Sequence, residues 1–143
     1  MSLLPIVVLR QHVTEAPVVL DASAVLAAFF DEPGADRIVE QMSGALLSTV
    51  NYAEVVAKLV DRGTPEEQIL EIMAQLDVKV VPVDRDQATT AGLLRATTRA
   101  AEMSLGGRAC LALAICRDGV ALTTDRAWES IADAARVQVF VVR

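Results

Sequence analysis

The sequence has few of the side chains that form disulfides or zinc sites, because it contains two cysteines and one histidine. Cys110 and Cys116 stand six positions apart within one helical pattern and therefore face different sides of it. Together with His12 they cannot complete the usual tetrahedral zinc site. We expect both cysteines to be small buried side chains of a reduced, cytoplasmic protein.

Long hydrophobic runs are also absent, and no apolar stretch approaches the roughly 20 residues that cross a bilayer. The apolar run at residues 3–9 is interrupted by Pro5 and lacks the basic start and small-residue cleavage site of a signal peptide. We expect no membrane association. With 53% hydrophobic residues over 143 positions, the sequence predicts one domain at 17–143. Residues 1–16 form an extension of uncertain order, in which Ile6 to Leu9 fit an edge strand or a loose arm equally well.

An excess of positive charge is missing as well. The formal net charge is −6, and lysine occurs only at Lys58 and Lys79, whereas arginine supplies the rest of the 13 basic residues. This balance argues against indiscriminate binding of nucleic acid through bulk charge. It does not exclude a nuclease, because an acidic site filled by cations can approach phosphates.

Short apolar runs alternate with helical patterns along the whole domain. The sequence predicts strands at 18–20, 45–48, 78–83, 120–123 and 137–142, with helices at 24–30, 35–42, 51–60, 65–76, 86–103, 108–117 and 126–134. Ser23 is expected to cap the first helix, and Gly106-Gly107 to interrupt the helical pattern before Arg108. The alternation predicts an α/β fold, a three-layer α/β/α sandwich with a mainly parallel central sheet.

Three carboxylates occupy comparable places in this pattern. Asp21 ends the first strand, Asp125 follows the fourth, and Glu54 lies one turn into the helix after the second. If these strands are neighbours, the acids converge where parallel sheets bind ligands. Clustered carboxylates repel one another and need a cation, and oxygen ligands favour Mg²⁺ or Mn²⁺. Such ions can activate water and stabilise the departing oxygen of a phosphodiester.

Each acid also has an explanation that needs no function. Asp125 could simply cap the helix that follows it, and Glu54 stands i,i+4 to Lys58, a common surface pair. Asp21 could only end its strand and orient Ser23. These alternatives stay open from the sequence.

A phosphotransfer enzyme of the haloacid-dehalogenase or receiver kind would also carry an aspartate after its first strand. Such proteins usually have an acid or threonine two residues later and a lysine near the site. Here Ser23 takes the first place, and neither Lys58 nor Lys79 lies at a suitable strand end. This class is therefore disfavoured.

Four sequence blocks follow one another in a fixed order: VLDASAVL at 19–26, NYAEV at 51–55, SLGGRACLALA at 104–114 and LTTDRAW at 122–128. They resemble the PIN-domain family, specifically the VapC-like ribonuclease toxins of type II toxin–antitoxin pairs. The resemblance implies a metal-dependent endoribonuclease that uses Mg²⁺ or Mn²⁺ to cleave RNA. It also implies a homodimer and a cognate antitoxin that covers the acidic site. By this resemblance Asp21, Glu54 and Asp125 match the metal-binding and catalytic acids, and Ser23 and Thr124 match supporting polar residues.

The chain departs from the family pattern at Gly107, where the family normally has a carboxylate. Either the protein is a natural variant with weak or no activity, or the substitution allows a toxic protein to be expressed. Without that acid, Arg108 would leave an uncompensated charge near the metal. We therefore expect a ribonuclease toxin impaired at Gly107; the alternative is a catalytically inactive PIN domain that binds its antitoxin and their operator complex.

Overall fold

The computed structural model describes residues 16–143, which form a five-stranded, all-parallel sheet. The strands are β1 (Val18–Leu20), β2 (Leu46–Ser48), β3 (Lys79–Val81), β4 (Val120–Thr123) and β5 (Gln138–Val141). Their order across the sheet is β3-β2-β1-β4-β5, and every pairing is parallel. All five strands lie within the predicted segments, and the parallel α/β architecture is confirmed.

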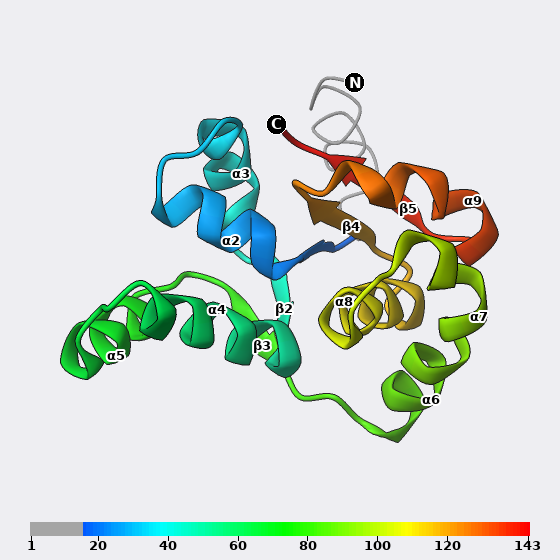
Figure 1. Cartoon of the computed structure of the whole chain (residues 1–143), viewed down its shortest axis with the longest axis horizontal. Helices are drawn as coiled ribbons and strands as arrows, with labels where there is room; N and C mark the ends of the chain where they lie inside the picture. Colours follow the sequence, from blue (N-terminus) through cyan, green and yellow to red (C-terminus); the bar gives the residue numbers. More distant parts are fainter. Residues whose placement is uncertain (1–15) are drawn as a thin grey trace.

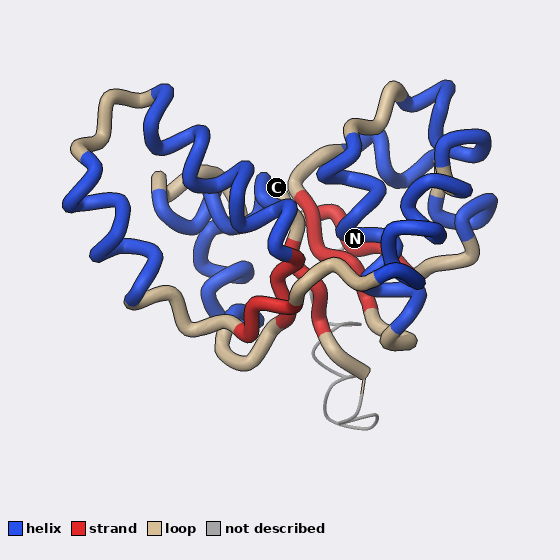
Figure 2. The backbone as a smooth tube through the Cα atoms, turned by 90° about the horizontal axis from the view of Figure 1, so that it is seen from below, coloured by secondary structure: helices blue, strands red, loops and turns tan. Residues whose placement is uncertain are grey.

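Helices cover both faces of this sheet and complete the predicted three layers (Figure 1). Successive residues of β1 face opposite layers: Val18 and Leu20 join one buried apolar cluster, and Val19 joins the other. Figure 2 shows the strands passing between two groups of helices. The first group is α2 (Ala22–Phe29), α3 (Ala35–Met42), α4 (Thr49–Asp61) and α5 (Glu66–Ala74); the second is α6 (Arg85–Leu93), α7 (Arg95–Thr98), η1 (Arg99–Ala101), α8 (Leu105–Cys116), η2 (Arg126–Ser130) and α9 (Ala132–Ala135).

The central strand β1 lies where the direction of chain winding reverses. From β1 the chain builds β2 and β3 on one side, then returns to place β4 on the other side. Leu20 is in register with Leu122, and the Asp21 backbone N–H donates to the Leu122 carbonyl over 2.9 Å. Ligands of open α/β sheets bind at such a reversal, beyond the carboxyl ends of the strands.

Three local predictions were wrong. Ser23 does not cap α2, because that helix begins at Ala22 with Asp21 in the N-cap position. The predicted helix 86–103 is divided into α6, α7 and η1, and the Thr98 hydroxyl at the end of α7 donates to the Leu94 carbonyl. The two glycines at 106–107 lie inside the first turn of α8, because Ser104 caps this helix by accepting a hydrogen bond from Gly107 N–H.

The remaining expectations have mixed outcomes. Cys110 is buried as predicted, but Cys116 is exposed at the end of α8, where the chain leaves the core. The interpretation of Ile6 to Leu9 falls outside the described residues. Within residues 16–143, none of the helices combines the length and the apolar character needed to cross a membrane.

Candidate active site

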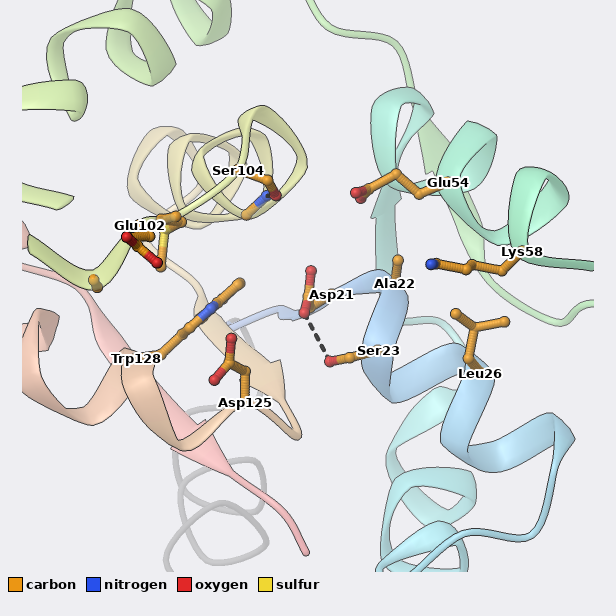
Figure 3. Close-up of a pocket in the computed structure, with 13 residues that line it drawn as sticks. Asp21, Ala22, Ser23, Leu26, Glu54, Lys58, Glu102, Ser104, Asp125 and Trp128 are labelled. Atoms are coloured by element: carbon orange, nitrogen blue, oxygen red, sulfur yellow. Dashed lines mark hydrogen bonds between the residues drawn. The ribbon is translucent and has the colours of Figure 1, made fainter. Parts of the chain in front are cut away.

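A pocket opens beyond the carboxyl ends of β1 and β4, and side chains from distant parts of the chain point into it (Figure 3). All three acids singled out in the sequence, Asp21, Glu54 and Asp125, line this pocket. Its other walls are Ala22, Ser23, Leu26, Lys58, Ala101, Glu102, Met103, Ser104, Gly107 and Trp128. The fold therefore brings the three carboxylates to one place, while their metal-binding role stays a prediction.

Asp21 is the most buried of these acids, with 8% of its surface exposed. Its Oδ2 accepts hydrogen bonds from the hydroxyls of Ser23 (2.7 Å) and Thr123 (3.0 Å). Burial raises the pKa of Asp21 above its ordinary value, and the two hydroxyls and nearby backbone N–H groups offset only part of this rise. A nearby cation would therefore stabilise the charged form of this carboxylate.

The supporting hydroxyl on β4 belongs to Thr123 rather than to Thr124, which corrects the sequence prediction. The Thr124 residue contributes its backbone N–H, which donates to Ser23 Oγ over 3.1 Å, and it lines a different pocket. Strand register was the missing information. Because Leu20 pairs with Leu122, the next residue, Thr123, comes to lie beside Asp21.

Glu54 is held by Asn51, a residue that the sequence analysis did not assign to the site. The Asn51 amide nitrogen donates to Glu54 Oε1 and to the Gly106 carbonyl oxygen, both over 2.9 Å, and Asn51 is fully buried. A Cβ atom at Gly106 would overlap the Glu54 carboxylate, so glycine leaves the room that this carboxylate occupies. The i,i+3 spacing of Asn51 and Glu54 on one helix was the available signal.

The charge on Glu54 is set by its neighbours. Burial raises the pKa of Glu54, the Asn51 hydrogen bond lowers it, the negative charge of Asp21 raises it further, and Lys58 lowers it. Two carboxylates that face one pocket repel each other. A divalent cation between them would relieve this repulsion.

Replacing Asn51 by alanine should lower the free energy of unfolding by roughly 1–3 kcal/mol, because the buried hydrogen bond to Gly106 and the part-buried one to Glu54 are lost. Urea denaturation monitored by circular dichroism measures this change. Gln68→Ala on the exposed surface of α5 is the matched control and should stay near the wild-type value. Equal stability of the two variants would show that Asn51 does not tie α4 to α8.

Asp125 serves the structural role considered from the sequence and also faces the pocket. Its Oδ1 accepts a hydrogen bond from the Ala127 backbone N–H over 3.0 Å and thereby caps η2. The same side chain is exposed and lines the pocket opposite Glu54 (Figure 3). Capping and a site role are therefore compatible for this residue.

Arg108 does not lie near the acids as the sequence suggested. Its side chain turns to α6 and donates from Nη1 to the Ala91 carbonyl over 3.1 Å, and it does not line the acid pocket. The basic residue that does line the pocket is Lys58, which reaches it from α4. The sequence places neither lysine at the end of a strand and so does not predict one at the site, but one further turn of α4 after Glu54 carries Lys58 to the pocket wall.

Gly107 also lines the pocket, and the space that a side chain at this position would occupy is filled by Met103 and Trp128. A Cβ atom there would lie 2.6 Å from Met103 Cγ and 3.2 Å from Trp128 Cζ2. Met103 and Trp128 are both buried, so they close the pocket wall against the bare Gly107 backbone. A carboxylate at this position would require the Met103 side chain to move.

The donor set fits a hydrated cation better than a fully protein-bound one. Within residues 16–143, no group of three or more His, Cys, Asp or Glu side chains is arranged to hold a metal ion. Mg²⁺ is commonly bound through one or two carboxylates while it keeps several waters. Asp21 and Glu54, which repel each other and are partly desolvated, could supply oxygen ligands of this kind, with Asp125 at the same pocket.

The fold is a parallel α/β/α sandwich, and three acids converge on a pocket at the strand ends where the direction of chain winding reverses. These two features define a class of α/β domains with an acidic site. The PIN domain family model matches residues 18–134, and the chain belongs to the PIN-domain family. A search of curated proteins found no match to the sequence.

Solved structures share this fold at low sequence identity. DNA-bound VapBC from Salmonella typhimurium aligns with a TM-score of 0.68 and 16% identity, covering 88% of this chain and 98% of that one. VapBC-1 from nontypeable Haemophilus influenzae gives 0.66 and 16%, covering 87% and 96%. A toxin–antitoxin complex from Klebsiella pneumoniae gives 0.60 and 15%, covering 77% and 87%.

Proposed function

We propose that this protein is a VapC-like toxin, a Mg²⁺- or Mn²⁺-dependent endoribonuclease that hydrolyses RNA phosphodiesters and is impaired at Gly107. The observation that carries the proposal is the convergence of Asp21, Glu54 and Asp125 on one pocket of a PIN domain. The toxin assignment draws on the fold shared with VapBC and with a toxin–antitoxin complex.

In this proposal Asp21 and Glu54 hold the cation, and Asp125 adds charge from the opposite wall. The bound ion would supply an activated water and charge stabilisation for the departing oxygen. The hydroxyls of Ser23 and Thr123 keep the Asp21 carboxylate in place. Since Asp21 is largely removed from water, its attraction for a cation is stronger than at a solvated surface.

A basic cleft beside the pocket gives RNA a route to it. Arg95 and Arg99 line this cleft together with Glu102 and Met103, and the last two residues also line the acid pocket. Arginine side chains match the geometry of phosphate groups. The two clefts therefore form a continuous surface on which an RNA strand could reach the carboxylates.

The second candidate function is a catalytically inactive PIN domain that binds a cognate antitoxin and forms an operator complex with it. The observation in its favour is the filled space at Gly107, where Met103 packs in place of a side chain. Under this alternative the pocket would be a binding surface for the antitoxin and would not turn over RNA.

Incubation of the purified protein with structured RNA distinguishes the two functions. We expect slow cleavage in millimolar Mn²⁺ that EDTA abolishes, together with reduced growth of cells in which the protein is induced. Absence of cleavage and of growth inhibition, with retained binding to an antitoxin, would favour the inactive domain. The control is Asp36→Asn, an exposed acid on α3 outside the pocket, which should behave as the wild type.

We further propose that the protein is a homodimer, as implied by its family. Several large apolar side chains are exposed and would gain from burial between subunits: Val39, Val60, Leu70, Val80, Leu93 and Leu105. Light scattering at micromolar concentration should give twice the 15.3 kDa mass of one chain. A mass of one chain under these conditions would contradict the dimer.

A further inference from the structure

Lys58 is the one basic residue among the described residues that line the acid pocket. The chain has only two lysines, and Lys58 is the one that lines this pocket. Asp21, Glu54, Glu102 and Asp125 line the same pocket, which therefore combines four acids with one base. A phosphate group that approaches these carboxylates meets strong repulsion unless a cation lies at the entrance.

The position of Lys58 differs from that of an ordinary surface pair with Glu54. Their i,i+4 spacing allows such a pair, and Lys58 lowers the pKa of Glu54, but within residues 16–143 no ion pair joins the two side chains. Figure 3 shows the Lys58 ammonium group directed into the pocket. The residue is exposed, so its long side chain can follow a bound group.

We propose that Lys58 binds a phosphate of the RNA strand at the acid pocket, next to the bond that is cleaved. This inference rests on the proposed function, since it assigns a contact for the same RNA substrate. The ammonium group is a compact charge with three donors on a flexible stem, which suits it to binding a phosphate. Lys58 also offsets part of the acid charge that faces the substrate.

Lys58→Gln should weaken the binding of RNA but not the binding of Mn²⁺. RNA affinity should fall roughly tenfold, the size of one charged hydrogen bond. The salt dependence of RNA binding should weaken by about 0.7 in the log–log slope, as expected for one lost phosphate contact on a single strand. Mn²⁺ affinity should stay equal or rise, because a cation has been removed from beside the metal.

The experiment measures fluorescence anisotropy of a short single-stranded RNA in Ca²⁺, with RNA integrity checked on a gel, and Mn²⁺ binding by calorimetry. Lys58→Arg keeps the charge and should retain RNA affinity. Lys79→Gln, which removes the other lysine on the exposed edge strand β3, is the matched charge control and should match the wild type.

Unchanged RNA affinity and salt slope in Lys58→Gln would overturn the inference, as would a loss of Mn²⁺ binding, which would indicate a role through Glu54. Both outcomes leave a wild-type protein that cleaves RNA, so the proposed function survives them. A wild-type protein that binds RNA without cleaving it contradicts the proposed function, while the affinity comparison still tests Lys58. Failure of the wild type to bind RNA overturns both.

Discussion

Gly107→Asp is expected to raise both Mn²⁺ affinity and RNA cleavage by roughly 10–100-fold or more. Changes to groups that merely support metal ligands already have effects of this size, so restoring a ligand should have at least as large an effect. The new carboxylate would also lie in the first turn of α8, where the helix dipole favours negative charge. Calorimetry with Mn²⁺, a cleavage assay and growth of induced cells measure the gain.

Met103 should limit this gain, because a Cβ atom at Gly107 would lie 2.6 Å from Met103 Cγ. The double variant Gly107→Asp/Met103→Ala removes the obstruction and should exceed the single variant in both assays. Met103→Ala alone is the control and should restore no activity. If neither the single nor the double variant is more active or more toxic than the wild type, the proposed impairment at Gly107 is contradicted, and the inactive PIN domain becomes the better account.

Asp21→Asn should abolish Mn²⁺ binding and lower cleavage roughly 100-fold or more, since it removes a charge that we propose binds the metal. The same change should raise the melting temperature of the metal-free protein at neutral pH. Asn keeps an oxygen that accepts from Ser23 and Thr123, while the unfavourable burial of a charge disappears. A variant that loses both activity and stability would show that Asp21 supports the fold instead.

The pH dependence of this stability difference has a defined sign. Burial raises the pKa of Asp21 in the folded protein above its ordinary value of 3.8, so the folded state holds the proton more tightly than the unfolded chain. The wild type should therefore lose stability relative to Asp21→Asn as the pH rises from 3.8 through the raised pKa. Above that range the difference should be constant. Melting curves of both proteins from pH 4 to pH 8, with and without Mn²⁺, test this, and the ion should narrow the gap.

Sequence patterns predicted the layers of this fold because its strands are short apolar runs bounded by helices. They also placed Asp21 and Asp125 correctly, since a residue that follows a parallel strand lies at the binding edge of the sheet. Glu54 was placed by the same logic, one turn into the helix after β2. These assignments need only the order of elements along the chain.

The contacts that depend on register and on side-chain direction could not be predicted. Thr123 was passed over for Thr124 because the pairing of β1 with β4 joins residues about 100 positions apart. The sequence predicted Arg108 near the acids, whereas the structure places Lys58 there. Both are long side chains whose direction depends on neighbouring helices. Asn51 was not assigned to the site because one of its two hydrogen-bond partners, the Gly106 carbonyl, lies on another helix that is distant in the sequence.

The hydroxyl network around Asp21 has a consequence for how the protein is made. Asp21 and Ser23 leave the ribosome early, whereas Thr123, which completes their hydrogen bonds, belongs to the fourth of the five strands. Chains are synthesised from the amino terminus, so the two halves of this network cannot meet until β4 has been made. A chain that ends before β4 therefore carries Asp21, Ser23 and Glu54 without the Thr123 hydroxyl and without Asp125, so the pocket forms only after β4 and the residues that follow it have been made.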